Sequence, residues 1–461
     1  MSYNGRTKIT SNVDVVDETN LIDVLNNANQ KFTQNVAQID YLFNYYKGIQ
    51  PILDRQKEVR SEINNKIVVN LAQAIVKFKT GYLLWKPIQY VARTEEVKSE
   101  DLSVLNGYME LENKETKDKL IANAQSICGT AYRLVLVNEE YDDEMDDSPF
   151  IIRTVEPRNA FVVYSANTGE ALLGVVVIRD VNAGGQITKY QAFSKDKYWV
   201  VDATTMLIEE TQSHTYGRIP LIEYPLNEER IGDFEIVLDL MDAVSLTQSN
   251  RVDGVEQFIQ SLLVFKNVEI NADMLAQLKD LGAINIKDNG EVEANISYLA
   301  QELNQTQVQT LIDCMIAQIL TIVGMPSKNN SGGAGSNTGQ AVIIANGWSE
   351  AEARANDTEL IFKASERDFL KLVLYITRTM TKTKLDLKMS ELEIKFTRRN
   401  YENVYQKAQV LDLMLKNDKI APRLAFVVCG LFQDPESAYM ESQDYFASLT
   451  KESEELLDGK M

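Results

Sequence analysis

Histidine and cysteine are nearly absent from this chain of 461 residues, which contains one histidine and three cysteines. Zinc sites need several such ligands, and a general base normally needs a partner that orients it. His214 stands in a polar stretch typical of an exposed turn. Cys128, Cys314 and Cys429 are far apart in apolar surroundings, so we expect buried, reduced thiols. The sequence therefore predicts no metal, no cofactor and no catalytic constellation.

Long uncharged apolar runs and a signal peptide are also missing, so we expect a soluble protein made in a cytoplasm, with no membrane partner. Basic residues are outnumbered: 47 Lys and Arg stand against 67 Asp and Glu, a net charge of -20. Phosphate contacts are made by Lys and Arg. The balance argues against tight wrapping of nucleic acid, although a protein that lets nucleic acid pass remains compatible with it.

Helical and strand patterns follow one another in large blocks. Apolar residues at helical spacing predict helices at 29–47, 67–85, 101–124, 233–265, 302–323 and 340–380, with terminal helices at 401–416, 422–431 and 435–446. Short apolar runs predict strands at 88–91, 132–137, 150–155, 160–164, 172–179, 189–193, 198–201 and 392–396. Within an insert at 268–296, we expect a helix at 272–281 and strands at 283–286 and 291–296, around a turn at Asn289-Gly290.

A polar tract rich in Gly, Ser and Asn at 324–339 interrupts two of the most helical segments. A loop of this length inside ordered structure is more often functional than incidental. A nucleotide-binding P-loop would end in Gly-Lys-Ser/Thr, but this tract ends Thr338-Gly339-Gln340 and follows a helix. The composition therefore disfavours nucleotide hydrolysis.

Two charged stretches remain open to more than one interpretation. The acidic run 142–147 lacks the central Gly and distal Glu of an EF-hand loop, so a solvated turn is favoured over a cation site. The cluster at 398–401 (Arg-Arg-Asn-Tyr) could contact phosphate, but a structural ion pair is the simpler interpretation.

Several stretches resemble the portal proteins of tailed bacteriophages, in particular the siphophage type of Gram-positive hosts. They are NKIVVN at 65–70, KTGYLLWKPI at 79–88, YGRIPLIEY at 216–224, NEERIGDFE at 227–235, LMDA at 240–243, SNRV at 249–252 and GSNTG at 335–339. The likeness covers most of residues 67–380. One departure is Ser245-Leu246-Thr247, which replaces a Tyr-Asn pair often found in that family's first stem helix.

The resemblance implies an α+β, portal-type protomer in a ring of about twelve copies. It has long stem and wing helices, a mainly antiparallel β wing domain, a small α/β clip insert and a helical crown. The implied regions are a wing at 1–231, a stem helix at 232–266, a clip at 267–300, a second stem helix at 301–324, a tunnel loop at 325–340, a wing helix and strand at 341–400, and a crown at 401–461.

The family also implies site residues and partners. The tunnel-loop residues expected at the DNA channel are Lys328, Asn329, Asn330, Ser331 and Asn337. The clip residues expected to dock the terminase large subunit and the head-completion adaptor are Lys279, Asp280, Lys287, Asp288, Glu291 and Glu293. Further implied partners are the major capsid and scaffolding proteins and the double-stranded DNA that passes through, at the portal vertex of the virion capsid.

Acidic residues of the first stem helix suggest one further hypothesis: if they face the channel, they keep the duplex off the wall. The residues concerned are Asp233, Glu235, Asp239, Asp242, Asp253 and Glu256. Two alternatives stay open at this point, a capsid adaptor that is not a portal and an enzyme with a phosphate-binding Gly-rich loop. A closed ring of about twelve subunits distinguishes the portal from both.

Overall fold

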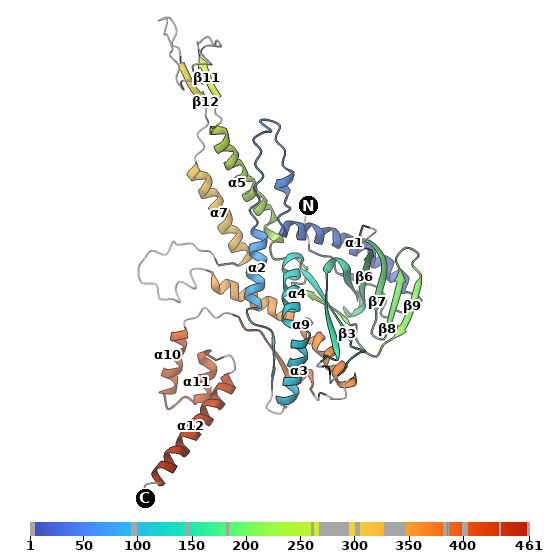
Figure 1. Cartoon of the computed structure of the whole chain (residues 1–461), viewed down its shortest axis with the longest axis vertical. Coiled ribbons are helices and arrows are strands. Elements are labelled where there is room, and N and C mark those ends of the chain that lie inside the picture. The colour runs from blue at the N-terminus through green and yellow to red at the C-terminus, as the bar shows by residue number, and fades with distance from the viewer. Residues whose placement is uncertain are drawn as a thin grey trace. The chain divides into compact units, whose positions relative to one another are not determined.

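The structure is a computed structural model. It describes residues 5–93, 99–142, 145, 147–180, 184–259, 262–266, 295–299, 305–326, 347–380, 385, 387–398, 404–432 and 435–458. Within them the chain is a mixed α+β protein with several sheets (Figure 1). It divides into two compact units. The large unit comprises residues 1–42, 74–235 and 323–461, and the small unit comprises 43–73 and 236–322.

A six-stranded sheet forms one core of the large unit. Its strand order is β1 (Ile9–Ser11), β5 (Ala160–Ser165), β6 (Ala171–Asp180), β7 (Gln186–Phe193), β8 (Lys197–Asp202) and β9 (Ile208–Ser213). All neighbours are antiparallel except the parallel pair of β1 and β5. Helix α1 (Leu21–Tyr46) buries Leu21, Leu25 and Phe32 against this sheet, with the Phe32 and Phe161 rings 4.6 Å apart.

A second core gathers around a three-stranded sheet of β10 (Leu221–Pro225), β3 (Thr130–Val137) and β4 (Phe150–Val155). Side chains of α3 (Ser99–Leu111), α4 (Lys114–Cys128) and the long α9 (Trp348–Met380) contribute to it, as does Leu83 at the end of the helix before them. Strand β2 (Gln89–Ala92) pairs with β13 (Leu392–Lys395) and adds Tyr90 and Ile394. The buried side chains thus join segments from both halves of the sequence.

Several predicted helices differ from those observed. The helix expected at 101–124 is two helices, because Asn113 adopts a left-handed φ of 49° between α3 and α4. The helix expected at 67–85 is α2 (Leu71–Leu83), and the residues before it have no regular secondary structure. Gly347, a candidate for a kink inside the helix expected at 340–380, instead precedes α9 with a φ of 80°. The strand expectations do not include β1, β9 and β10.

Among its described residues, the small unit includes α5 (Leu238–Ile259) and all but the last residue of α7 (Gln305–Val323), together with the short helix η1 (Pro51–Asp54). Arg251 of α5 donates from Nε to Gln305 at 2.8 Å and also binds Gln309, so the two helices lie side by side (Figure 1). The helix predicted at 233–265 is longer than the observed α5, which ends at Ile259. Leu262–Lys266 is strand β11, paired antiparallel with β12 (Asn295–Leu299). The predicted helix at 272–281 and the turn at Asn289 lie outside the described residues.

Three helices follow near the C-terminus: α10 (Val404–Leu415), α11 (Pro422–Cys429) and α12 (Pro435–Asp458). The Phe426 ring lies 5.2 Å from Phe432 and 5.7 Å from Tyr439, centroid to centroid. Pro422 begins α11 where its missing N–H has no cost, and Gly430 ends it in the left-handed conformation. Helix α12 continues twelve residues beyond its predicted end at 446, into the expected acidic tail.

Among the described helices, α7 alone is long and apolar enough to cross a membrane by length and composition, with a mean hydropathy of 1.3. Only 17% of its apolar window is buried. The expectation of no membrane span rested on the lack of long uncharged apolar runs, and α7 is not such a run because it contains Asp313. Among the described residues, few side chains therefore cover this apolar helix.

Candidate functional site

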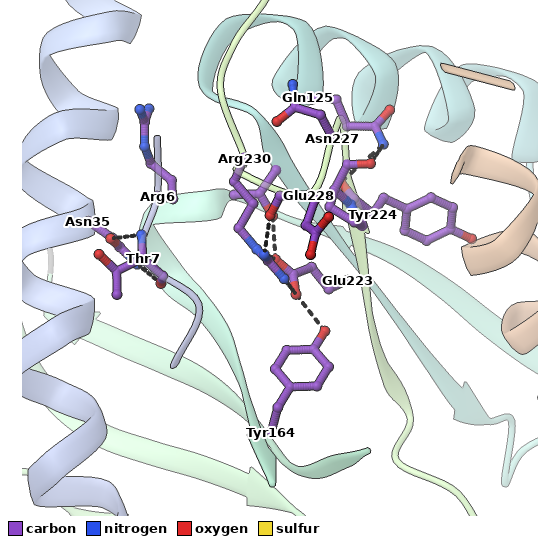
Figure 2. A network of polar contacts seen from close by, with 12 residues as sticks. Arg6, Thr7, Asn35, Gln125, Tyr164, Glu223, Tyr224, Asn227, Glu228 and Arg230 are labelled. Carbon is purple, nitrogen blue, oxygen red and sulfur yellow. Dashed lines mark hydrogen bonds and ion pairs between the residues drawn. The ribbon is translucent and has the colours of Figure 1, made fainter. Parts of the chain in front are cut away.

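Residues 223–235 contain the motif at 227–235 and the end of the motif at 216–224. Their side chains form a network of ion pairs and hydrogen bonds (Figure 2). Arg230 donates from Nε and Nη2 to the two carboxylate oxygens of Glu223 at 2.7 and 2.9 Å. Glu223 also accepts from the hydroxyls of Tyr164 and Thr130. Burial alone would raise the pKa of Glu223, but the donors from Arg230 outweigh it and leave the pKa below its ordinary value. The pair stays charged and ties the loop after β10 to β3 and β5.

An N-terminal segment closes over the same loop. Arg6 forms a buried ion pair with Glu235, donates from Nη1 to the Cys128 carbonyl at 3.3 Å, and donates its backbone N–H to the Arg230 carbonyl. Next to it, Thr7 and Asn35 exchange two hydrogen bonds of 2.9 Å between the Thr7 backbone and the Asn35 amide (Figure 2). The segment is thereby attached both to α1 and to the loop that leads into α5.

Two glycines let this loop approach the end of α4 backbone to backbone. A Cβ at Gly232 would lie 2.4 Å from the Ile127 carbonyl oxygen, and one at Gly129 would lie 2.0 Å from the Arg230 carbonyl oxygen. Real Cβ contacts are not this short, so only glycine fits. Ser126 completes the contact, because its hydroxyl donates to the Asp233 carboxylate at 2.6 Å.

Four buried charges hold α9 against α4 and β3. Lys114 lies 2.6 Å from Asp118 and 2.7 Å from Glu366, while Arg133 binds both carboxylates. The hydroxyls of Tyr90 and Tyr224 also donate to Glu366. Two cations and two anions balance, which is the arrangement that makes buried charge tolerable.

The first turns of α9 contact α2 and the residues that follow α7. Gly324 has a φ of 66°, and a Cβ there would lie 2.3 Å from Cδ of Arg354. A Cβ at Gly347 would lie 3.7 Å from Cα of Pro326, so residues 326 and 347 are neighbours. The Trp348 ring lies 6.0 Å from Phe78 and 5.9 Å from Tyr82. The chain thus leaves and re-enters the described structure at one place on either side of residues 327–346.

The predicted site residues at 327–346 and 267–294 lie outside the described residues. This applies to the tunnel-loop residues Lys328, Asn329, Asn330, Ser331 and Asn337, and to the clip residues Lys279, Asp280, Lys287, Asp288, Glu291 and Glu293. Their roles stay predictions. The described residues that precede and follow them in the sequence are those of α5 and β11, of β12 and α7, and of α9.

The hypothesis that the acids of the first stem helix face DNA is wrong for Glu235 and Asp253, whose side chains are buried in ion pairs, and stays a prediction for the other four. Asp233 binds Ser126, Glu235 binds Arg6, and Asp242 accepts from the Tyr45 hydroxyl at 2.8 Å. Asp253 is almost fully buried beneath Arg55 and Lys57. Asp233 and Asp242 are only partly buried, Glu256 is partly buried and accepts from the Asn65 amide at 2.9 Å, and Asp239 is exposed. The sequence showed their charge but not their partners, which are up to 229 residues away.

The remaining candidates have ordinary structural roles. Arg398 pairs with Glu352 at 2.9 Å and with Glu359, which confirms the ion-pair interpretation. His214 is half-buried and stacks 4.5 Å from the Tyr216 ring, so the expectation of an exposed turn is wrong; burial lowers its pKa. Cys128 and Cys429 are buried as expected, but Cys314 of α7 is exposed. Across the described parts of the chain, no group of three or more His, Cys, Asp or Glu could hold a metal.

Comparison with known proteins gives two findings. The model of a family described as "Phage portal protein, SPP1 Gp6-like" matches residues 25–458. The portal protein of Bacillus phage SPP1 is similar to this chain, with 23% identity over 251 residues, which cover 54% of this chain and 48% of that protein. The match therefore spans about half the length of that relative.

Proposed function

This chain belongs to the SPP1 Gp6-like family of phage portal proteins, and we propose that copies of it form the ring-shaped DNA channel at one vertex of a phage capsid. The resemblance noted in the sequence is thereby confirmed at the level of the family. Membership in this family also excludes the two alternatives, the enzyme and the capsid adaptor that is not a portal. The proposed tasks are packaging with a terminase, retention and ejection of DNA, and attachment of the tail through an adaptor.

The exposed apolar surface of helix α7 is the observation that best supports a ring. It is strongly apolar, yet only 17% of its most apolar stretch is buried, and Leu311 and Ile322 are 52% and 39% exposed. An exposed apolar stripe of this kind normally marks a protein–protein interface. A second copy of the same helix pair is the partner that a ring provides at every position.

The charge of the helix pair supports passage of DNA rather than grip. Helix α7 contains one acid, Asp313, and no Lys or Arg. On α5, Arg251 is occupied by Gln305 and Gln309. Each phosphate that a protein neutralises adds affinity through counterion release, so a wall with few free cations lets a duplex slide. Low basic charge, rather than the acidic wall first suggested, is therefore the proposed basis of sliding.

Particle mass tests the ring directly. Native mass spectrometry of the full-length protein should find a closed assembly of about twelve copies. Leu311→Asp should reduce it to monomers that keep the helical circular dichroism of the wild type. Leu207→Asp is the matched control, since Leu207 is a 66% exposed leucine in the large unit. A monomeric wild type, or rings that survive Leu311→Asp unchanged, contradicts the proposal.

A separate experiment tests the tunnel-loop prediction. We propose that Lys328 of each copy makes a sparse, weak contact with the passing duplex. Lys328→Ala should weaken DNA retention in packaged particles most at low salt, because a single phosphate contact is screened as salt rises. If packaging and retention are unchanged at every ionic strength, Lys328 has no such role, while the ring itself is untouched by this result.

A further inference from the structure

Residues 55–70 run along α5 without regular secondary structure of their own, and we call them the strap. Their backbone N–H groups bond to side chains of α5. Val69 N–H donates to the Ser245 hydroxyl at 3.2 Å, and Ile67 N–H donates to the Ser249 hydroxyl at 2.9 Å. Asn65 N–H donates to the Asp253 carboxylate at 2.8 Å. Both serines are fully buried, so these three contacts are shielded from water.

The spacing of donors and acceptors matches because two periods nearly coincide. Acceptors four residues apart on a helix are ~6 Å apart along its axis. N–H groups two residues apart on an extended chain are ~6.6 Å apart. Residue numbers fall along the strap as they rise along α5, so the two run antiparallel. Each step therefore adds a mismatch of only ~0.6 Å, so a one-to-one ladder of three rungs accumulates ~1.2 Å, which hydrogen bonds can absorb.

Two further features support these three hydrogen bonds: a hydrogen bond that the Ser249 hydroxyl donates, and salt bridges to Asp253. The Ser249 hydroxyl donates its proton to the Ser245 carbonyl at 2.8 Å, which leaves its oxygen free to accept from Ile67. Asp253 is bound by Arg55 at 3.0 Å and by Lys57 at 3.1 Å, both from the strap. Burial would raise the pKa of Asp253, but the Asn65 and Lys57 hydrogen bonds outweigh it and leave the pKa lowered.

The salt bridges to Asp253 also exclude a second register of the strap along α5. Position 257, one turn beyond Asp253, carries a Gln that could likewise accept, so the three N–H groups alone could bind one turn further along α5. Only in the observed register does the buried carboxylate meet Arg55 and Lys57. A shift by one turn would leave a buried charge without its partners, which is strongly unfavourable.

We propose that the strap sets the register and rotation of α5, with Ser245, Ser249 and Asp253 as its positioning residues. The strap links the last residues of α1 to the first residues of α2, both of which belong to the small unit from Phe43 to Gln73. The device therefore determines which face of α5 is left for other partners. It does not depend on whether copies of the chain assemble.

Hydrogen exchange of the full-length protein, read residue by residue, tests the ladder. Ser249→Ala should accelerate exchange at the Ile67 amide about tenfold, with smaller changes at Val69 and Asn65, because one hydrogen bond is lost. Ser249→Thr should restore protection, since it keeps the hydroxyl. Asp253→Asn keeps an acceptor but loses the charge, so exchange should rise at Asn65 and spread along the strap as the register loosens.

Asp239→Asn is the control, because Asp239 is an exposed acid of the same helix and should change none of the three amides. Should Ser249→Ala fail to fold, Ser245→Ala tests the neighbouring rung, at Val69 alone. Unchanged exchange at Ile67 in Ser249→Ala would overturn the proposal. So would an equal rise at all three amides, or a failure of Ser249→Thr to restore protection.

Discussion

Arg133 Nη1 lies 3.1 Å from Glu366 Oε2, and neither side chain is exposed to solvent. The contact joins the middle strand of the three-stranded sheet to the long helix α9, 233 residues later in the chain. Lys114 and Asp118 of α4 complete the charge balance. The helix that begins beside the predicted tunnel loop is thus held by charges in the protein interior, and several predictions concern this anchorage.

Glu366→Gln should destabilise the protein by about 3–5 kcal/mol, because it leaves Lys114 and Arg133 with one carboxylate between them inside the core. The measurement is the free energy of unfolding in urea. Glu350→Gln removes a carboxylate from the same helix, but from an exposed i,i+4 pair with Arg354, and should cost at most about 1 kcal/mol. Equal effects of the two substitutions would show that the buried cluster has no special weight.

Lowering the pH should destabilise the wild-type protein, because Glu366 becomes protonated. Burial would raise the pKa of Glu366, but Lys114 and Arg133 outweigh it and lower the pKa from 4.5 to about 2. A carboxylate whose pKa falls on folding stabilises the protein above its unfolded pKa. This contribution, roughly 3 kcal/mol, is lost as the pH falls from 4.5 towards 2. Urea midpoints at pH 7, 5, 4 and 3 should fall less steeply in Glu366→Gln; parallel curves would contradict the assignment.

Gly232→Ala should cost about 1–3 kcal/mol, because the new methyl group would lie 2.4 Å from the backbone carbonyl oxygen of Ile127 and the two segments would have to move apart. Gly107 provides the opposite case. It lies inside α3, and a methyl group added there would meet no neighbouring atom within 4 Å, so Gly107→Ala should stabilise by about 0.5–1 kcal/mol. Thermal unfolding of both variants decides; a neutral Gly232→Ala would contradict the close approach.

Arg6→Ala should destabilise by about 3–5 kcal/mol, since Glu235 would remain buried without a cation. Lys8→Ala removes a cation from the same segment. Lys8 is exposed and lies over the Tyr164 ring at 4.4 Å, a contact that contributes about 0.5–1 kcal/mol. The midpoints of thermal unfolding of the two variants should therefore differ by roughly 4 °C, because the unfolding entropy of a unit as large as the one that contains Arg6 is high. The same shift for both variants would contradict a buried ion pair at Arg6.

Local patterns can be predicted from the sequence, and partners distant in sequence cannot. The strand at 150–155 and the end of α9 at Met380 follow from short-range periodicity and agree with the structure. The helix predicted over α5 is too long, because Leu262–Lys266 is apolar enough for either state and its pairing with β12 decides. The end of the strap falls within the helix predicted at 67–85, because Ile67-Val68-Val69 continues an apolar helical pattern.

The candidate site shows the same difference between local patterns and partners that are distant in the sequence. The stretch 223–235 can be found by resemblance, but the partners of Glu223, Asp233 and Glu235 lie on other elements, so the sequence alone suggests an exposed acidic helix where the acids are paired. One signal for the strap is present: Ser245, Ser249 and Asp253 recur every fourth residue, which places three acceptors on one helical face. The clip and tunnel residues stay predictions.

The bond between Arg6 and Glu235 has a consequence for synthesis. The two residues are 229 positions apart, and ribosomes add about 5–20 residues per second. Arg6 therefore emerges roughly 10–50 s before its partner exists. During that interval the first strand has no β5 to pair with until residue 160 is made, and the Arg6 guanidinium has no carboxylate at position 235. This ion pair can consequently form only after about half of the chain has been made, although Arg6 is among the first residues to be made.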